Sequence, residues 1–162
     1  MIKVLFVCLG NICRSPMAEA IFRDLIKKER MENYITVDSA GTGSWHIGEP
    51  PHWGTRKILR ENNISAEGLI ARQISAEDIN RFDYIVAMDL SNIESIKELG
   101  ADFPEGKVTT LLDYVPEIED KNIPDPYYTG NFTEVYKLVE KGCRNLLEHI
   151  KTVHFLNKKI SN

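Results

Sequence analysis

The chain has 162 residues, of which 43% are hydrophobic and 27% charged, and this composition excludes a disordered or collagen-like chain. The formal net charge is −4 at pH 7, and no cluster of Lys and Arg indicates a nucleic-acid partner or a membrane-binding helix. The apolar run Val4–Leu9 is far shorter than the ~20 residues that span a membrane, so we expect no membrane contact.

The first part of the chain predicts two buried strands, each followed by a helix. Ile2–Cys8 is a nearly continuous apolar run, typical of a strand that is buried on both faces. Ser15–Pro16 indicates a helix start, with the serine as cap and Glu19 favourable near the positive end of the helix. A second strand is predicted over Ile35–Ala40, and a second helix over residues 51–62.

The middle of the chain continues the alternation of helix and strand. Ser75–Asp78 predicts a short capped helix, and Tyr84–Met88 predicts another buried strand. A capping box at Ser91–Glu94 indicates a helix that ends near Leu99. Val108–Leu112 predicts the last strand.

The remaining residues predict a long loop and a long helix. Residues 113–131 are proline-rich and irregular, and a loop of this length in a compact domain is usually functional. Phe132–Ile150 has the apolar spacing of a helix, with Cys143 on its buried side. The polar tail over residues 155–162 is expected to fray.

Strands that alternate with helices indicate an α/β fold. We expect an open four-stranded parallel sheet with helices on both faces, in one domain over residues 1–162. In such sheets ligands bind beyond the C-terminal ends of the strands. The loop after the first strand, residues 8–15, is therefore the first place to look for chemistry.

The loop Cys8–Ser15 has the residue types of an oxyanion site. Gly10 and Asn11 suit a left-handed backbone, in which successive N–H groups can converge on an anion. The start of the following helix adds unpaired donors and a partial positive charge. Arg14 can bind two phosphate oxygens through its planar guanidinium. The spacing thus predicts a phosphate-binding loop.

Cys8 stands where this loop would activate a nucleophile. A helix N-terminus and a neighbouring cation both stabilise a thiolate, and the thiolate is the reactive form of cysteine. The alternative is a small buried cysteine at a strand end with an unrelated arginine on a helix. The combination of all eight residues favours the nucleophile.

Asp125 is the candidate proton donor for a leaving group. It lies in the long loop between two prolines, which limit its backbone. A carboxylic acid there could protonate a leaving phenolate and later act as base on water. Tyr127 and Tyr128 could wall a pocket around an aromatic ring. An ordinary Asp-Pro turn remains an equally good interpretation of the local sequence.

Three cysteines occur in the chain, at Cys8, Cys13 and Cys143. An odd and sparse count, with no export signal at the start of this sequence, predicts reduced thiols and a cytoplasmic protein. Cys143 is expected in the core. No spacing of cysteines and histidines suggests a metal site, so we expect no metal.

Two motifs resemble the signatures of a known family. VCLGNICRSPMAEA, over Val7–Ala20, is similar to the signature of the low-molecular-weight protein tyrosine phosphatases, and DPYY, over Asp125–Tyr128, is similar to their general-acid loop. Further stretches match the family in order: Asp38–Gly41, Ala71–Gln73 and Asp83–Asp89. The resemblance covers nearly the full chain and is strongest to bacterial members.

The resemblance implies an enzyme that hydrolyses phosphotyrosine in two steps without a metal or cofactor. Cys8 would attack phosphorus and form a phosphocysteine, while Arg14 holds the phosphate oxygens. Asp125 would give a proton to the tyrosyl oxygen. Ser15 would help the Cys8 thiolate leave when water attacks.

The resemblance also implies binding residues and partners. Asn11, held by Ser39, would keep the loop in its strained shape. The partners would be tyrosine-phosphorylated proteins, with a tyrosine kinase among the candidates, and inorganic phosphate as product. The loop and the aromatic slot would bind the phosphate and the ring through Leu9, Gly10, Asn11, Ile12, Cys13, Trp45, Tyr127 and Tyr128.

Three smaller expectations follow from the resemblance. Cys13 could trap an oxidised Cys8 as a reversible disulfide, or be only a small apolar side chain under the loop. Leu69 stands where some relatives have a histidine that supports Asn11, so that support is either weaker or completed differently. Trp53 is expected to serve packing.

Other functions remain as alternatives. A phosphocysteine carrier also has a cysteine at the end of its first strand, but it needs neither Arg14 nor an acid such as Asp125. Protein-arginine phosphatases resemble the loop but tend to have Thr in place of Ile12, and they lack the double tyrosine. Arsenate reductases of this fold need further cysteines in mid-chain. A dinucleotide site or nucleotide-binding P-loop lacks its glycine or Gly-Lys-Ser/Thr motif.

Overall fold

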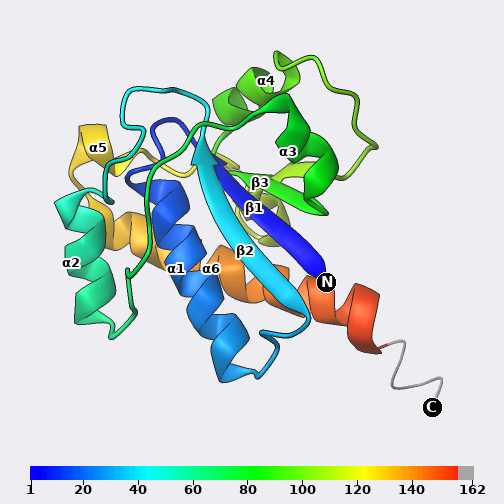
Figure 1. Ribbon diagram of the computed structural model, residues 1–162. Helices are drawn as coiled ribbons and strands as arrows, with labels where there is room; N and C mark the ends of the chain where they lie inside the picture. Colours follow the sequence, from blue (N-terminus) through cyan, green and yellow to red (C-terminus); the bar gives the residue numbers. More distant parts are fainter. Residues whose placement is uncertain (157–162) are drawn as a thin grey trace.

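The computed structural model describes residues 1–156 as an open parallel sheet between two layers of helices (Figure 1). The four strands lie in the order β2-β1-β3-β4, and every neighbouring pair is parallel. The strands are β1 (Ile2–Cys8), β2 (Ile35–Gly41), β3 (Tyr84–Ala87) and β4 (Val108–Thr110). The helices are α1 (Arg14–Lys28), α2 (Trp53–Glu61), α3 (Ala76–Arg81), α4 (Leu90–Lys97), the 3-10 helix η1 (Leu111–Tyr114), α5 (Pro126–Thr129), α6 (Phe132–Ile150) and the π-helix η2 (Lys151–Leu156). The expected α/β class, parallel sheet and four strands are confirmed.

Alternate residues of the strands face the two helical layers. Val4 and Phe6 of β1 pack in the larger core with α1 and α6, whereas Leu5 and Val7 pack in the smaller core with α3 and α4. All four side chains are fully buried. A strand with both faces covered needs apolar residues at every position, which is why β1 shows no polar alternation.

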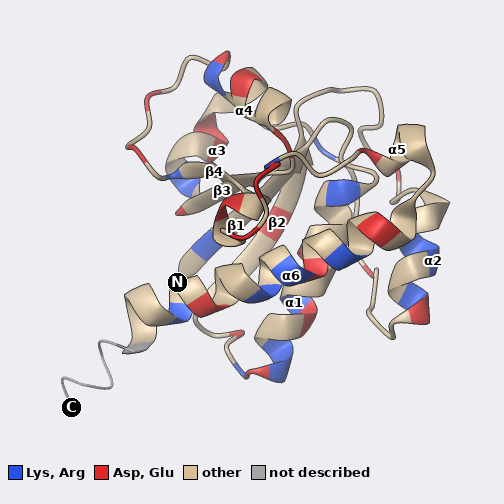
Figure 2. Cartoon of the chain, turned by 180° about the vertical axis from the view of Figure 1, so that it is seen from behind, with Lys and Arg blue, Asp and Glu red and all other residues tan. Residues whose placement is uncertain are grey.

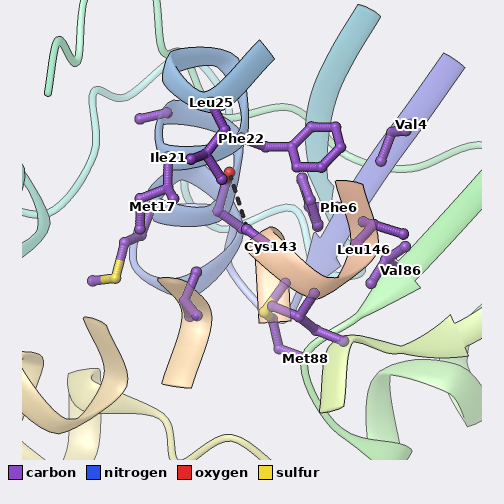
Figure 3. Packing of buried hydrophobic residues seen from close by; sticks show 14 of the residues in the cluster. Val4, Phe6, Met17, Ile21, Phe22, Leu25, Val86, Met88, Cys143 and Leu146 are labelled. Atoms are coloured by element: carbon purple, nitrogen blue, oxygen red, sulfur yellow. Dashed lines mark hydrogen bonds between the residues drawn. The ribbon is translucent and has the colours of Figure 1, made fainter. Parts of the chain in front are cut away.

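The larger core joins the two longest helices to the sheet (Figure 3). The rings of Phe6 and Phe22 meet edge to face at 5.5 Å between centroids. Cys143 is fully buried on α6 and its thiol points to the Ala18 carbonyl at 3.8 Å, so its prediction as a core residue is confirmed. Burial raises the pKa of the Cys143 thiol, which keeps it protonated and unreactive.

Two helix starts differ from the sequence prediction. The helix α1 begins at Arg14 with Cys13 at its N-cap position, so Ser15 does not cap it but lies inside its first turn. The helix α4 begins two residues earlier than expected, because Asp89 rather than Ser91 caps it, together with Asn92. The start of α4 follows from a local bond, since Asp89 accepts the backbone N–H of Asn92, whereas Cys13 forms no side-chain cap at α1.

Other boundaries differ at the ends of elements. The chain leaves the sheet after Thr110 and turns into η1, and the stretch 113–131 contains the short helix α5. The helix predicted over 51–62 begins at Trp53. Phe155, expected to fray, lies within η2 and contacts Tyr34 at 5.7 Å between ring centroids. The rest of the predicted tail lies outside the described residues.

The strand order places one crevice at the C-terminal edge of the sheet. The chain leaves β1 through α1 to reach β2 on one side, and it later enters β3 on the other side of β1. The loops that follow β1 and β3 therefore run in opposite directions and leave a crevice between them. Ligands of open α/β sheets bind in such a crevice. Cys8 ends β1 there, and Asp89 follows β3.

Among the helices of residues 1–156, none combines the length and the apolar character needed to cross a membrane.

Candidate active site

The sulfur of Cys8 lies within reach of two hydrogen-bond donors. The backbone N–H of Asn11 donates to Sγ at 3.3 Å, and the Ser15 hydroxyl oxygen lies 3.0 Å from it. That hydroxyl already accepts a hydrogen bond from Asn11 Nδ2 at 2.7 Å, so its own proton is available for the sulfur. Donors directed at a sulfur favour its negatively charged form. The arrangement is suited to a thiolate.

Asn11 holds the loop in its turn. Its backbone is left-handed, with φ at 57°, and its side chain is almost fully buried. The side-chain amide donates to Ser15 and, at 2.9 Å, to Ser39, and its oxygen accepts the backbone N–H of Arg72 at 3.0 Å. A left-handed residue costs about 1–2 kcal/mol unless it is Gly, and these three hydrogen bonds offset that cost. The expected contact between Asn11 and Ser39 is present.

Glu19 completes the network that begins at Asn11. The Ser39 hydroxyl accepts from Asn11 and donates to Glu19 Oε1 at 2.6 Å, while Arg23 pairs with the other carboxylate oxygen. Burial raises the pKa of Glu19, although the bonds from Ser39 and Arg23 act in the opposite direction. Leu69 is buried in the core. The network around Asn11 is therefore completed by the carboxyl group of Glu19, through Ser39.

Arg72 anchors the segment whose backbone supports Asn11. Its guanidinium donates from Nη1 and Nη2 to the two oxygens of Asp78, at 3.0 and 3.2 Å, and from Nε to Asp38 at 3.1 Å. Burial alone would lower the pKa of Arg72, but the two carboxylates outweigh it and raise the pKa. The side chain thus fixes the position from which its N–H reaches Asn11.

Gly41 lets the loop lie directly against the end of β2. A Cβ at this position would come within 2.9 Å of the Leu9 carbonyl oxygen and 3.1 Å of Asn11 atoms. Gly10, in contrast, is not left-handed, so that part of the prediction is wrong and only Asn11 has this backbone. A Cβ on Gly10 would approach the His46 ring at 3.1 Å, so the glycine makes room for that side chain.

Arg14 is a buried cation, and one of its three side-chain nitrogens has no partner in the part of the chain that the structure describes. Nη1 donates to Asp89 at 2.7 Å and to the Ile123 carbonyl at 2.9 Å, and Nη2 lies 3.4 Å from Asp125. Nε has no partner among the described residues, although it is buried. Burial alone would lower the pKa of Arg14, but the charge of Cys8 and the bond to Asp89 raise it. A bound oxyanion would satisfy Nε.

Asp125 combines a structural role with a place at the site. Oδ1 accepts the backbone N–H of Tyr127 at 3.1 Å and caps α5, and Pro126 follows as the first helical residue. Oδ2 faces Arg14 across the 3.4 Å contact. The cap directs the second oxygen into the cavity beside Cys8, so the local turn and the site geometry depend on one carboxylate.

A cavity of about 320 Å³, lined by Cys8 and Asp125 but not by Arg14, opens to solvent. Trp45 and Tyr128 are 69% and 74% exposed and form its outer rim, whereas Cys8 and Cys13 are buried at its inner end. Asn11, Ser15 and Ser39 do not line it but support it from below. The predicted residues that line the cavity are Cys8, Leu9, Gly10, Ile12, Cys13, Trp45, Asp125, Tyr127 and Tyr128, and His46 joins them.

Four residues of the site were not assigned a role from the sequence. They are Glu19, Arg72, Asp89 and His46. Asp89 carried a usable signal, since an Asp followed three residues later by Asn indicates a helix cap at the end of a strand. The others gave no signal for these roles. The contacts that bring Glu19 and Arg72 into the network, with Ser39 and with Asn11, join residues 20 or more positions apart in the chain.

Cys13 is a thiol with a different character from Cys8. Burial, followed by the charges of Cys8 and Asp125, raises the pKa of Cys13 to about 12. It is therefore protonated at neutral pH, and its carbonyl oxygen accepts a hydrogen bond from the Thr55 hydroxyl at 3.1 Å. All three cysteines are free in this structure. Both readings of Cys13, as a redox partner and as a packing residue, remain open.

The chain belongs to the low molecular weight phosphotyrosine protein phosphatase family, whose model matches residues 3–155. It is thus an enzyme of the protein-tyrosine-phosphatase class. The low molecular weight protein-tyrosine-phosphatase YfkJ of Bacillus subtilis is 56% identical over 93% of this chain and 97% of its own. Its crystal structure superposes with a TM-score of 0.92, with 55% identity over 95% of this chain and 97% of that chain.

Two further proteins are similar to this chain over nearly its whole length. The low molecular weight protein-tyrosine-phosphatase PtpA of Staphylococcus aureus is 50% identical over 93% of this chain and 94% of its own. The solved structure of a Drosophila arginine phosphatase is 38% identical, with a TM-score of 0.84, over 93% of this chain and 98% of that chain. The same fold thus occurs in proteins named for two kinds of phosphorylated residue.

The Glu19 carboxyl should make stability depend on pH. Its pKa is raised in the folded protein, so the folded state holds this proton more tightly than the unfolded chain does. The stability from this group is therefore greatest below the unfolded pKa and falls as pH rises through the folded pKa. Glu19→Gln keeps an oxygen acceptor for Ser39. We expect the free energy of unfolding of this variant to increase relative to that of the wild type as pH rises.

Urea midpoints of both proteins, measured from about pH 4.5 to about pH 7.5, check this expectation. Glu105→Gln, at an exposed position, controls for the loss of one acidic side chain. If the urea midpoints of the wild type and Glu19→Gln differ by the same amount at every pH in this range, the raised pKa assigned to Glu19 is contradicted.

Cys13 should protect Cys8 from irreversible oxidation. Peroxide would convert the Cys8 thiolate to a sulfenic acid, and the Cys13 thiol would condense with it to a disulfide and release water. We expect the wild type to recover activity after peroxide and then dithiothreitol, and Cys13→Ser to recover little. Cys143→Ser is the matched control. Equal recovery in all three proteins would make Cys13 a packing residue only.

Proposed function

We propose that the protein hydrolyses phosphotyrosine in protein substrates through a phosphocysteine intermediate on Cys8. The observation that carries the proposal is the environment of this sulfur, which faces a cavity and lies close to two donors and a buried arginine. Membership of the phosphotyrosine phosphatase family supports it.

In the first step the Cys8 thiolate attacks phosphorus, and the bond from phosphorus to the tyrosyl oxygen breaks. Arg14 binds two of the phosphate oxygens through Nε and Nη2, since Nη1 is held by Asp89 and the Ile123 carbonyl. The N–H groups of the loop bind the remaining charge. Asp125 gives its proton to the tyrosyl oxygen as it leaves.

In the second step water attacks the phosphocysteine and releases inorganic phosphate. Asp125, now a carboxylate, takes a proton from this water, as microscopic reversibility requires. The Ser15 hydroxyl donates to the departing sulfur, because its lone pair is already engaged by Asn11. Asn11, Ser39 and Glu19 keep these donors in place.

The cavity walls support phosphotyrosine as the substrate. Tyr127 and Trp45 offer aromatic surface at the rim, and Ile12 adds an apolar wall deeper in. A phosphotyrosine ring can span the distance from rim to sulfur, which a phosphoserine side chain is too short to do. The partners we infer are tyrosine-phosphorylated proteins, including tyrosine kinases. A reduced nucleophile also supports the cytoplasm as its place of action.

Phosphoarginine is the second candidate substrate, because a relative at 38% identity is named an arginine phosphatase. Ile12 and the pair Tyr127 and Tyr128 favour phosphotyrosine over it. A phosphocysteine carrier would share Cys8 but would hold its phosphate until an acceptor arrives, rather than lose it to water.

Phosphate release from matched phosphotyrosine, phosphoserine and phosphoarginine peptides tests the proposal. With a metal chelator present, we expect fast release from phosphotyrosine alone, and none in Cys8→Ser. A preference for phosphoarginine would overturn the argument from the cavity walls. No release, with a stable phosphoenzyme, would indicate the carrier.

Asp125→Asn should slow the hydrolysis of phenyl phosphate by roughly 10²–10⁴, because a general acid contributes about this much. The amide keeps an oxygen that can cap α5, so the loop should retain its shape. We expect a much smaller effect with dinitrophenyl phosphate, whose leaving group needs no proton. Steady-state kcat on both substrates measures the difference. Equal losses on the two substrates would remove Asp125 from proton transfer.

A further inference from the structure

The outer face of α2, formed by Trp53, Arg56 and Arg60, exposes side chains that usually seek a partner. Trp53, which the sequence led us to expect in packing, is 62% exposed, and both arginines are exposed. Spacings of three and four residues place the three on one side of the helix. Exposed Trp and Arg are the residue types enriched at the centres of protein interfaces.

The two arginines of this face have no charged partner within residues 1–156. Neither guanidinium forms an ion pair or a side-chain hydrogen bond within residues 1–156, whereas Lys57 on the same helix pairs weakly with Glu61 at 3.9 Å. The two arginines and Trp53 line a shallow hollow of about 400 Å³, floored by Ile64 and Ala66. The hollow offers two cations beside apolar surface.

This face is continuous with the active-site cavity. A groove of about 430 Å³ runs between α2 and α5, and it is lined by Trp53 at one end and by Tyr127 at the other. Tyr127 also lines the active-site cavity, and Trp53 also lines the hollow. His52 lies between them, with its ring centroid 6.1 Å from Tyr127 and 6.2 Å from Trp53. Figure 2 shows the basic residues of α2 close to α5.

We propose that the outer face of α2 binds an acidic segment of the phosphoprotein substrate that flanks the phosphotyrosine. The proposal rests on the proposed function. With the phosphotyrosine ring against Tyr127, the adjoining peptide can follow the groove past His52 to α2. Asp or Glu side chains in that segment would pair with Arg56 and Arg60, and its apolar atoms would cover Trp53.

Charge favours an acidic occupant. The whole chain has a formal charge of −4, so its net charge disfavours an acidic peptide. The helix α2 carries three cationic residues, Arg56, Lys57 and Arg60, and one acidic residue, Glu61. The cations of α2 attract an acidic peptide, whereas the net negative charge of the chain repels it, so the peptide is favoured at α2 over other places. This attraction weakens as the salt concentration rises.

The test compares two phosphotyrosine peptides that differ only in flanking Glu or Gln residues, placed in turn before and after the phosphotyrosine. The enzymes are the wild type, Arg56→Gln/Arg60→Gln and the control Arg81→Gln/Lys97→Gln, which removes the same charge from α3 and α4. These control helices lie on the far side of the molecule from α2 (Figure 1). Phenyl phosphate, which is too small to reach α2, reports the basal reaction.

We expect the wild type to prefer the Glu peptide in kcat/KM by about 3- to 10-fold at low salt, as two exposed ion pairs would give. The preference should disappear in Arg56→Gln/Arg60→Gln and persist in Arg81→Gln/Lys97→Gln. All three enzymes should hydrolyse phenyl phosphate equally.

Several outcomes would overturn the proposal. No preference in the wild type, or an equal preference in both variants, removes α2 from recognition. A dimer of the wild type that dissociates in Arg56→Gln/Arg60→Gln, with the peptide preference unchanged, would make a second copy the occupant. Failure of the wild type to hydrolyse phenyl phosphate would instead reject the proposed function, and the docking proposal with it.

Discussion

The site depends on one left-handed residue. Asn11 reverses the chain between β1 and α1, and this turn directs a backbone N–H at the Cys8 sulfur. The turn is unfavourable for a residue with a Cβ, so it needs support from elsewhere. That support comes from Ser15, Ser39 and the backbone of Arg72, which between them satisfy the Asn11 amide. The loop is thus held in one shape by its own contacts, and in the reaction we propose its donors would need no reorganisation.

The same constraint explains where buried charge occurs. A loop built to hold an anion requires a cation beneath it, and Arg14 is held there by Asp89 and the Ile123 carbonyl. Burying a guanidinium is costly unless it is paired. Asp89 supplies that pairing while also capping α4, and the Arg14 and Ser91 hydrogen bonds keep its pKa low against the effect of burial. Asp125 likewise faces Arg14 and caps α5. The two carboxylates that face Arg14 are thus also helix caps, so the site shares its rigidity with the fold.

Reactivity and recognition lie in different layers of the site. The sulfur, the arginine and their supporting hydrogen bonds are buried, where a low dielectric strengthens each interaction. Trp45, Tyr127 and Tyr128 are exposed at the rim, and a further row of aromatic rings leads from Tyr127 to Trp53. The buried layer suits any phosphate monoester. The exposed layer is where substrates can be distinguished, and the outer face of α2 extends it beyond the cavity.

The sequence by itself determined the α/β class, the four strands and the loop that carries Cys8 and Arg14, because these depend on local patterns of apolar residues and on short motifs. Phe132–Ile150 was predicted to the residue, since one long amphipathic helix has a strong period. Tertiary structure alone decided that Ser15 does not cap α1, that Gly10 needs no left-handed backbone, and that Glu19 completes the network around Asn11. Glu19 and Ser39 are 20 residues apart in the chain, and a hydrogen bond across such a distance leaves no periodic signal. The place of Trp53 at the surface was likewise decided by how α2 packs against α1 and α6, which no local pattern in the sequence specifies.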